Sequence, residues 1–183
     1  MKALREVGVG RLARYGAWSS FSALLRAAPT PPLRAALLRA AGARIGRGSV
    51  IGPGLRLENL DRGRGAAALQ IGRDCWIAPD VHFDLADEVV LGDSVSVGSR
   101  SVFNTHLNVG YADHPLHEHM PPRTGSVVVG PGSFVGVGAI LLAGTRLGPE
   151  TFVAAGSVVG GEHEGGVLLG GAPARVLRRW ADS

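Results

Sequence analysis

Four of the six histidines in this chain fall between residues 106 and 119, at His106, His114, His117 and His119. An imidazole has an unperturbed pKa of about 6.5, so at neutral pH it can accept a proton from a hydroxyl or an amine. Imidazoles are also common zinc ligands, and with His82 the region supplies enough of them for a metal site. These residue types therefore predict either general-base catalysis or zinc binding.

The single cysteine, Cys75, is the other side chain that could act as a nucleophile. It stands at a place where the repeat described below requires a small inward-pointing side chain. We therefore expect Cys75 to fill space in the core, as unpaired cysteines commonly do. One cysteine also rules out an internal disulfide framework.

The rest of the chain must hold these side chains in place, and its main feature is a six-residue repeat. Aliphatic residues recur at every sixth position in the order Val129, Val135, Leu141, Leu147, Val153 and Val159. Small residues follow four places later in each unit, at Ser133, Ala139, Thr145, Thr151 and Ser157. Helices and ordinary strands do not have this period, whereas a chain wound into flat, stacked coils does.

The same unit begins earlier, at Ile45, and resumes at Ile71 and Leu91 after interruptions. Three short strands and three turns would make a triangular coil of ~18 residues, with neighbouring coils a strand spacing of ~4.8 Å apart. The number of units predicts four to five coils. The first residue of each unit is expected to point inward and to stack on its equivalents in adjacent coils.

The chain divides into three parts on this pattern. Residues 1–43 predict two helices, separated by the Pro29-Thr30-Pro31-Pro32 cluster and expected to cover one end of the coils. Residues 44–162 form the repeat body, from which residues 110–126 depart as an excursion loop. Residues 163–183 form a C-terminal tail. Arginines interrupt the apolar stretches near the N-terminus, so we expect neither a transmembrane helix nor a signal peptide. We therefore expect a cytoplasmic protein.

Composition narrows the classes of partner. The formal net charge is +4, but acidic residues are interspersed with the arginines and no basic run interleaves with aromatic residues. Nucleic-acid binding is not expected, because tracking phosphates requires a concentrated basic stripe. Membrane association is not expected either. A local pair of arginines that holds the phosphate of a small ligand remains compatible with this charge distribution.

Two segments add to the repeat. The first lies in the excursion loop and reads Asp113-His114-Pro115-Leu116-His117-Glu118. The second, near the end of the chain, reads Gly170-Gly171-Ala172-Pro173-Ala174-Arg175-Val176. With these segments the chain resembles the hexapeptide-repeat acyltransferases, in the branch of the maltose/galactoside O-acetyltransferases. The resemblance covers residues 45–180 and implies a mainly β fold, a left-handed parallel β-helix with an N-terminal helical segment and an excursion loop.

The resemblance also implies a homotrimer that uses acetyl-CoA as the acyl donor, with the coenzyme lying along the repeat body near a subunit boundary. It points to Phe134, Ala155 and Ser157 along the pantetheine arm. Arg175 and Arg178 are the candidates for its phosphates. Phe134 departs from the family pattern, because many relatives have tryptophan there.

For catalysis, the resemblance implies that His114 is the general base that takes a proton from the attacking hydroxyl. His106, at a predicted turn position and expected to point outward near the start of the loop, is the rival candidate. Polar residues expected to reach the same cleft and to bind the acceptor are Asp84, Asn104 and Asn108. Aspartate and asparagine also cap turns readily, so a purely structural role stays open for each of these three residues.

The predicted function is the transfer of an acetyl group from acetyl-CoA to a hydroxyl of a sugar, an oligosaccharide or a sugar-like small molecule. Three alternatives remain open at this point. One is an N-acetyltransferase of an amino sugar, which needs the same base chemistry. Another is a zinc-dependent protein similar to the γ-type carbonic anhydrases. The last is a non-catalytic trimeric scaffold.

Overall fold

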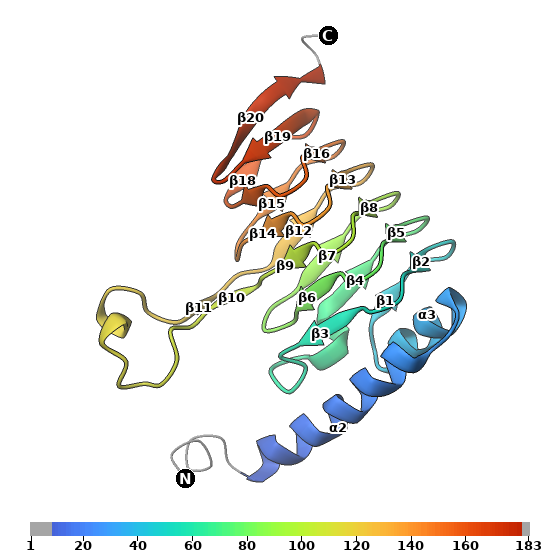
Figure 1. The fold of residues 1–183 in the computed structure, drawn as a ribbon, viewed down its shortest axis with the longest axis vertical. Helices are drawn as coiled ribbons and strands as arrows, with labels where there is room; N and C mark the ends of the chain where they lie inside the picture. The colour runs from blue at the N-terminus through green and yellow to red at the C-terminus, as the bar shows by residue number, and fades with distance from the viewer. Residues whose placement is uncertain (1–8, 181–183) are drawn as a thin grey trace.

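The computed structural model describes residues 9–180, and the ends of the predicted first and last segments, residues 1–8 and 181–183, lie outside this range. The body is a column of stacked coils whose strands form three sheets, one on each face of the column (Figure 1). The first face consists of β1 (Arg44–Ile45), β4 (Leu69–Ile71), β7 (Val89–Leu91), β12 (Val127–Val129), β15 (Arg146–Leu147) and β18 (Glu162–His163). The second consists of β2 (Val50–Ile51), β5 (Trp76–Ile77), β8 (Ser96–Val97), β13 (Phe134–Val135), β16 (Phe152–Val153), β19 (Val167–Gly171) and β20 (Ala174–Arg179). The third consists of β3 (Arg56–Glu58), β6 (His82–Asp84), β9 (Val102–Phe103), β14 (Ile140–Leu141) and β17 (Val158–Val159).

The six-residue period sets the register of these strands. Val135 pairs with Val153, and Leu141 pairs with Val159, so that equivalent residues of successive units stack on one another. All four side chains are fully buried. The third face has five strands, so five coils are complete within the described residues, at the upper end of the predicted number.

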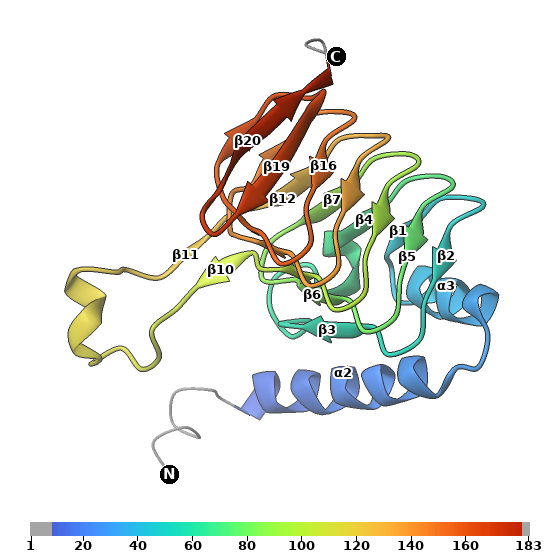
Figure 2. The same ribbon diagram turned by 45° about the horizontal axis from the view of Figure 1, so that its top comes forward.

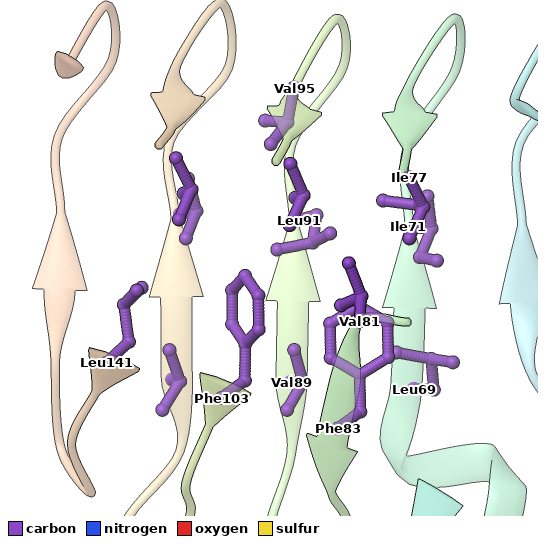
Figure 3. Packing of buried hydrophobic residues seen from close by; sticks show 14 of the residues in the cluster. Leu69, Ile71, Ile77, Val81, Phe83, Val89, Leu91, Val95, Phe103 and Leu141 are labelled. Carbon is purple, nitrogen blue, oxygen red and sulfur yellow. The ribbon is translucent and has the colours of Figure 1, made fainter. Parts of the chain in front are cut away.

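The interior is a narrow column of aliphatic side chains with one aromatic pair. Phe83 and Phe103 are fully buried, with ring centroids 4.9 Å apart, and lie beside Val81, Val89 and Leu141 (Figure 3). Cys75 is buried as well, and burial raises the pKa of its thiol. A protonated, buried thiol is a poor nucleophile, which supports the expectation that Cys75 fills space in the core.

Two helices cover the first coil: α2 (Val9–Ala27) and α3 (Pro31–Ala40). Helix α3 packs on β1 and β2 and buries Leu38, while Leu25 of α2 is buried nearby. The buried guanidinium of Arg34 donates to the carbonyl oxygens of Ile51 and Ala28, both at 2.7 Å. The bond to Ile51 satisfies a carbonyl at the open end of the coils, where no earlier coil is present, and the bond to Ala28 ties α3 to the connection between the two helices. Neither of the described helices is long and apolar enough to cross a membrane.

Two segments leave the regular coils. The excursion loop begins at β10 (His106–Leu107), which pairs in antiparallel fashion with β11 (Arg123–Thr124), and contains the 3-10 helix η2 (Pro115–Glu118). The shorter excursion after β3 contains η1 (Gly65–Ala68). In both views the loop with η2 and the N-terminal part of α2 project from the same side of the body (Figures 1 and 2).

The end of the chain continues the second face before it turns back. Strand β19 pairs in parallel with β16, and β20 then pairs with β19 in antiparallel fashion. The indole of Trp180 donates to the carbonyl oxygen of Glu150 at 2.8 Å, which fastens the end of β20 to the body. Much of the segment predicted as a tail is therefore strand.

Candidate active site

The candidate site lies at the corner where the chain passes from the third face to the first. Strand β6 ends at Asp84, and β9 ends at Phe103, followed by Thr105 and His106. Because Phe83 and Phe103 are register partners, the residues that follow the two strands lie at the same corner in adjacent coils. The parallel register thus brings together side chains that are 22 positions apart in the sequence.

Asp84 is the centre of this corner. It is only 3% exposed, and its Oδ2 atom lies 2.6 Å from Nδ1 of His106. The same oxygen accepts hydrogen bonds from the Thr105 backbone N–H at 2.8 Å and from the Thr105 hydroxyl at 2.9 Å. The other oxygen, Oδ1, accepts from the Asn59 side-chain amide at 2.6 Å and from the Ala86 backbone N–H at 3.2 Å. All these partners can donate, so the network fits an ionised carboxylate.

The protonation of Asp84 follows from this network. Burial by itself would raise the pKa of the Asp84 carboxyl, but hydrogen bonds from His106, Asn59 and Thr105 outweigh it and hold the pKa below its ordinary value. A carboxylate facing Nδ1 assigns the proton of the neutral imidazole to Nδ1, which leaves the lone pair of Nε2 available. The His106 side chain is 26% exposed, so that lone pair can be reached from the surface.

His114 is held differently. It caps η2 in the projecting loop, where its Nδ1 accepts a hydrogen bond from the Leu116 backbone N–H at 3.1 Å. An accepting Nδ1 places the proton of the neutral ring on Nε2, so the exposed nitrogen is a donor. The His117 ring lies 6.5 Å away, centroid to centroid. In the single chain, then, the Asp84 carboxylate holds Nδ1 of His106 and leaves Nε2 as a free acceptor, whereas His114 has no such free acceptor nitrogen.

The other predicted acceptor-binding residues lie near the start of the same loop. Asn104 Oδ1 is 3.5 Å from the backbone nitrogen of His106, and Asn108 Oδ1 accepts from the Gly110 backbone N–H at 2.9 Å. Both side chains therefore support the turns that lead into the loop.

Asn59 and Thr105, which donate hydrogen bonds to Asp84, were not predicted from the sequence. The signal for Asn59 was its place directly after a third-face strand, one coil before Asp84.

The residues proposed for coenzyme A lie away from this corner. Phe134 points outward from the second face and stacks on Phe152, with ring centroids 4.7 Å apart. Phe152 and Leu168 are register partners, and so are Leu168 and Arg178, so an outward row runs from Phe134 to Arg178.

The remaining three coenzyme candidates differ in exposure. Ala155 and Arg175 are exposed, and Arg175 donates to the carbonyl oxygen of its neighbour Ala174. Ser157, by contrast, is 1% exposed. Its side chain therefore fills the coil in the single chain, and only neighbouring atoms at this position reach the surface.

Within residues 9–180, histidine, cysteine, aspartate and glutamate side chains do not form any group of three that could hold a metal ion. His82, one of the histidines considered for zinc, lies 3.4 Å from a carboxylate oxygen of Glu58 on the neighbouring strand. The zinc-dependent alternative thus has no supporting ligand cluster in this part of the chain.

Comparisons with known proteins bear on the fold and on the family that the chain resembles. No family model matches the chain. It is 28% identical over 145 residues to the provisionally named colanic acid biosynthesis acetyltransferase WcaF of Escherichia coli, with 79% of this chain and 74% of that protein covered. It is 21% identical over 131 residues to the galactoside O-acetyltransferase of Escherichia coli, with 61% of this chain and 64% of that protein covered. The matched region is thus less than two thirds of that enzyme's length.

Among solved structures, the chain is similar to the hexapeptide-repeat acetyltransferase VCA0836 of Vibrio cholerae in complex with acetyl-CoA. The TM-score is 0.76 at 23% identity, and 88% of this chain and 84% of that chain are covered. At this identity the likeness establishes the fold. It confirms the predicted left-handed parallel β-helix.

Proposed function

We propose that this chain transfers an acetyl group from acetyl-CoA to a hydroxyl of a sugar or sugar-like acceptor. The comparisons confirm its predicted resemblance to the hexapeptide-repeat acyltransferases. The enzyme class is supported by sequence relatives that are named acetyltransferases. The donor is supported by a structural neighbour that was solved with acetyl-CoA. A sugar acceptor is supported by the names of the same relatives, which refer to a galactoside and to colanic acid biosynthesis.

The observation that carries the mechanism is the Asp84–His106 pair, with 2.6 Å between Oδ2 and Nδ1. Nε2 of His106 accepts the proton of the acceptor hydroxyl while the hydroxyl oxygen attacks the thioester carbonyl carbon. The carboxylate of Asp84 holds the ring in the required tautomer and stabilises the imidazolium that forms. When the tetrahedral intermediate collapses, the C–S bond breaks and the proton passes from Nε2 to the thiolate of coenzyme A. The products are an acetyl ester and free coenzyme A.

His114 is the second candidate for the base, on the resemblance of its loop segment to that of the acetyltransferase branch. A projecting loop of this kind can reach across to a neighbouring subunit, so the His114 hypothesis is tied to the proposed homotrimer. If His114 acts there, its hydrogen bond from Leu116 must break or its ring must turn, because Nδ1 is already occupied.

For the donor, the outward row from Phe134 to Arg178 offers an aromatic surface at one end and a guanidinium at the other. An extended arm can lie along such a row, and Arg178 with Arg175 can pair with its phosphates. Because this row lies away from the Asp84–His106 corner of the same chain, the mechanism requires the proposed homotrimer to bring the row of one subunit to the corner of its neighbour. Ala155 and the backbone around Ser157 offer a close approach to the chain.

The proposal also retains the division of the chain into residues 1–43, 44–162 and 163–183, and a cytoplasmic location.

The test is release of the coenzyme A thiol from acetyl-CoA, measured across a panel of sugars and matched amines. We expect turnover with sugars, and His106→Ala should lower kcat by roughly 10²–10⁴-fold if its imidazole is the base. His114→Ala is assayed in parallel, because near-normal turnover by one variant assigns the base to the other histidine. Faster transfer to amines would redirect the proposal to N-acetylation, and no thiol release with any acceptor would refute it.

A further inference from the structure

A cleft of about 680 Å³ lies between helix α2 and the end of strand β3, outside the residues assigned so far to the acceptor or the coenzyme. One wall is a stripe of α2 that includes Tyr15, Trp18, Ser22 and Arg26. Residues at intervals of three and four lie on one face of a helix, so these side chains point into the cleft together. Figure 2 shows α2 running along the body beside β3.

Trp18 packs against neighbouring residues in this wall. Its ring packs edge-on against Phe21, with ring centroids 5.6 Å apart and planes at 84°. On another side it lies against Gly65, where an added Cβ would come within 2.8 Å of the Trp18 ring. Gly65 also has φ +58°, in the left-handed region that favours glycine. Glycine at this position therefore allows the indole to pack closely, and the ring forms an aromatic surface at the cleft.

One residue of the opposite wall is hydrogen-bonded to the catalytic corner. It includes Glu58 and Asn59, and the Asn59 amide donates to Asp84, which in turn holds His106. Strand β3 is two strands from β9 in the third face, a separation of about 10 Å at the usual strand spacing. A molecule that reacts at His106 and also reaches Trp18 must therefore be longer than one pyranose ring.

The chemistry of the walls fits a carbohydrate. A pyranose ring presents flat C–H faces, which suit an aromatic ring, and a rim of hydroxyls, which suit charged and amide groups. The cleft has aromatic rings at Tyr15 and Trp18 and hydrogen-bonding groups at Ser22, Arg26, Glu58 and Asn59. We infer that this cleft binds a second sugar unit of the acceptor, so that the substrate is an oligosaccharide or an extended glycoside. This inference rests on the proposed function, because it assumes that the first unit lies at His106.

The test uses the intrinsic fluorescence of Trp18 and needs no acetyl-CoA. In the full chain carrying Trp76→Phe and Trp180→Phe, Trp18 is the only remaining tryptophan. Lactose and maltotriose are titrated against galactose and glucose, and emission is followed. We expect a saturable change with the oligosaccharides and at least tenfold weaker binding of the monosaccharides. Equal binding of both groups, or no change with any of the four sugars, would overturn the inference.

Two exposed residues of α2 provide matched variants. Tyr15 is 61% exposed and lines the cleft, whereas Leu24 is 55% exposed and does not line it. Tyr15→Ala should weaken oligosaccharide binding at least fivefold, and Leu24→Ala should leave it unchanged. An equal effect of the two substitutions would contradict the assignment of the cleft. If the tryptophan variants do not fold, kcat/KM for maltotriose and glucose in the otherwise unchanged Tyr15→Ala chain gives the same comparison.

The results separate this inference from the proposed function. Oligosaccharide binding at Trp18 without any acetyl transfer would refute the function and leave the sugar site in place. Acetyl transfer to monosaccharides and oligosaccharides with equal kcat/KM, unaffected by Tyr15→Ala, would support the function and refute the second sugar site.

Discussion

Replacement of Asp84 by asparagine tests the catalytic corner at its centre. Both carboxylate oxygens of Asp84 face donors, namely His106 and Thr105 on Oδ2 and Asn59 and Ala86 on Oδ1. An amide supplies one oxygen and one NH₂ group, so at least one set of donors then meets another donor. If the NH₂ group faces His106, Nδ1 must accept, the proton moves to Nε2, and the imidazole loses its free lone pair.

The expected loss follows from what general-base catalysis contributes. Removing it lowers kcat by roughly 10²–10⁴-fold, which corresponds to about 3–5 kcal/mol of activation free energy. The KM for acetyl-CoA should change little, because the proposed coenzyme residues lie on the second face, away from Asp84. Buried donors left without an acceptor should also lower the free energy of unfolding by about 1–3 kcal/mol.

The assay is thiol release under saturating acetyl-CoA, with denaturant unfolding measured in parallel. Asp93→Asn is the matched control, since Asp93 also accepts from a neighbouring side chain, Arg73, but lies on the exposed surface. The decisive comparison is the double variant Asp84→Asn/His106→Ala. If Asp84 acts through His106, the double variant is no slower than His106→Ala alone. A folded Asp84→Asn protein with wild-type kcat, or additive losses in the double variant, would refute the reasoning.

Three further predictions concern stability. The pKa of Asp84 is depressed in the folded protein, so the stabilisation from its carboxylate is complete above the unfolded pKa of about 3.9 and is lost as pH falls through the folded pKa. The free energy of unfolding should therefore fall less steeply with decreasing pH in Asp84→Asn than in wild type. Arg34→Met removes the donor to the Ile51 carbonyl and should lower the free energy of unfolding by about 2–4 kcal/mol in urea titrations, and an unchanged midpoint would contradict its role at the first coil. Gly136→Ala should destabilise the coils and lower Tm, because its Cβ would lie 2.5 Å from a backbone nitrogen of the next coil. Gly16→Ala, in open space on α2, should instead raise the free energy of unfolding by about 0.5–1 kcal/mol. Equal Tm values for these two variants would show that the close approach is unimportant.

The repeat made the body of this protein predictable from its sequence. Each unit carries an inward aliphatic residue and a turn at fixed places, so the side-chain directions of Val129, Val135 and Leu141 follow from their spacing alone. Stacking is a nearest-neighbour interaction between identical units, and it needs no knowledge of distant parts of the chain. Coil shape, the buried column and the excursion loop could all be predicted for this reason. The handedness came from the resemblance.

The catalytic corner was only partly predictable. The sequence marked Asp84 and His106 separately, one for acceptor binding and the other as a rival base, but did not pair them. Their contact depends on the register between coils, and an irregular step between repeats near residue 90 made that register ambiguous. The hydrogen bonds from Asn59 and Thr105 depend on the same register, and only the tertiary structure decided them.

The cleft beside α2 was not predictable at all. In the sequence its two walls, α2 and the end of β3, are separated by α3, β1 and β2, and the docking of a helix on the end of a β-helix follows no period that a sequence displays. The sequence by itself determined which side chains enter the column, because the repeat fixes their direction. The tertiary structure decided which polar side chains meet outside it, because those meetings depend on how irregular segments pack against a regular body.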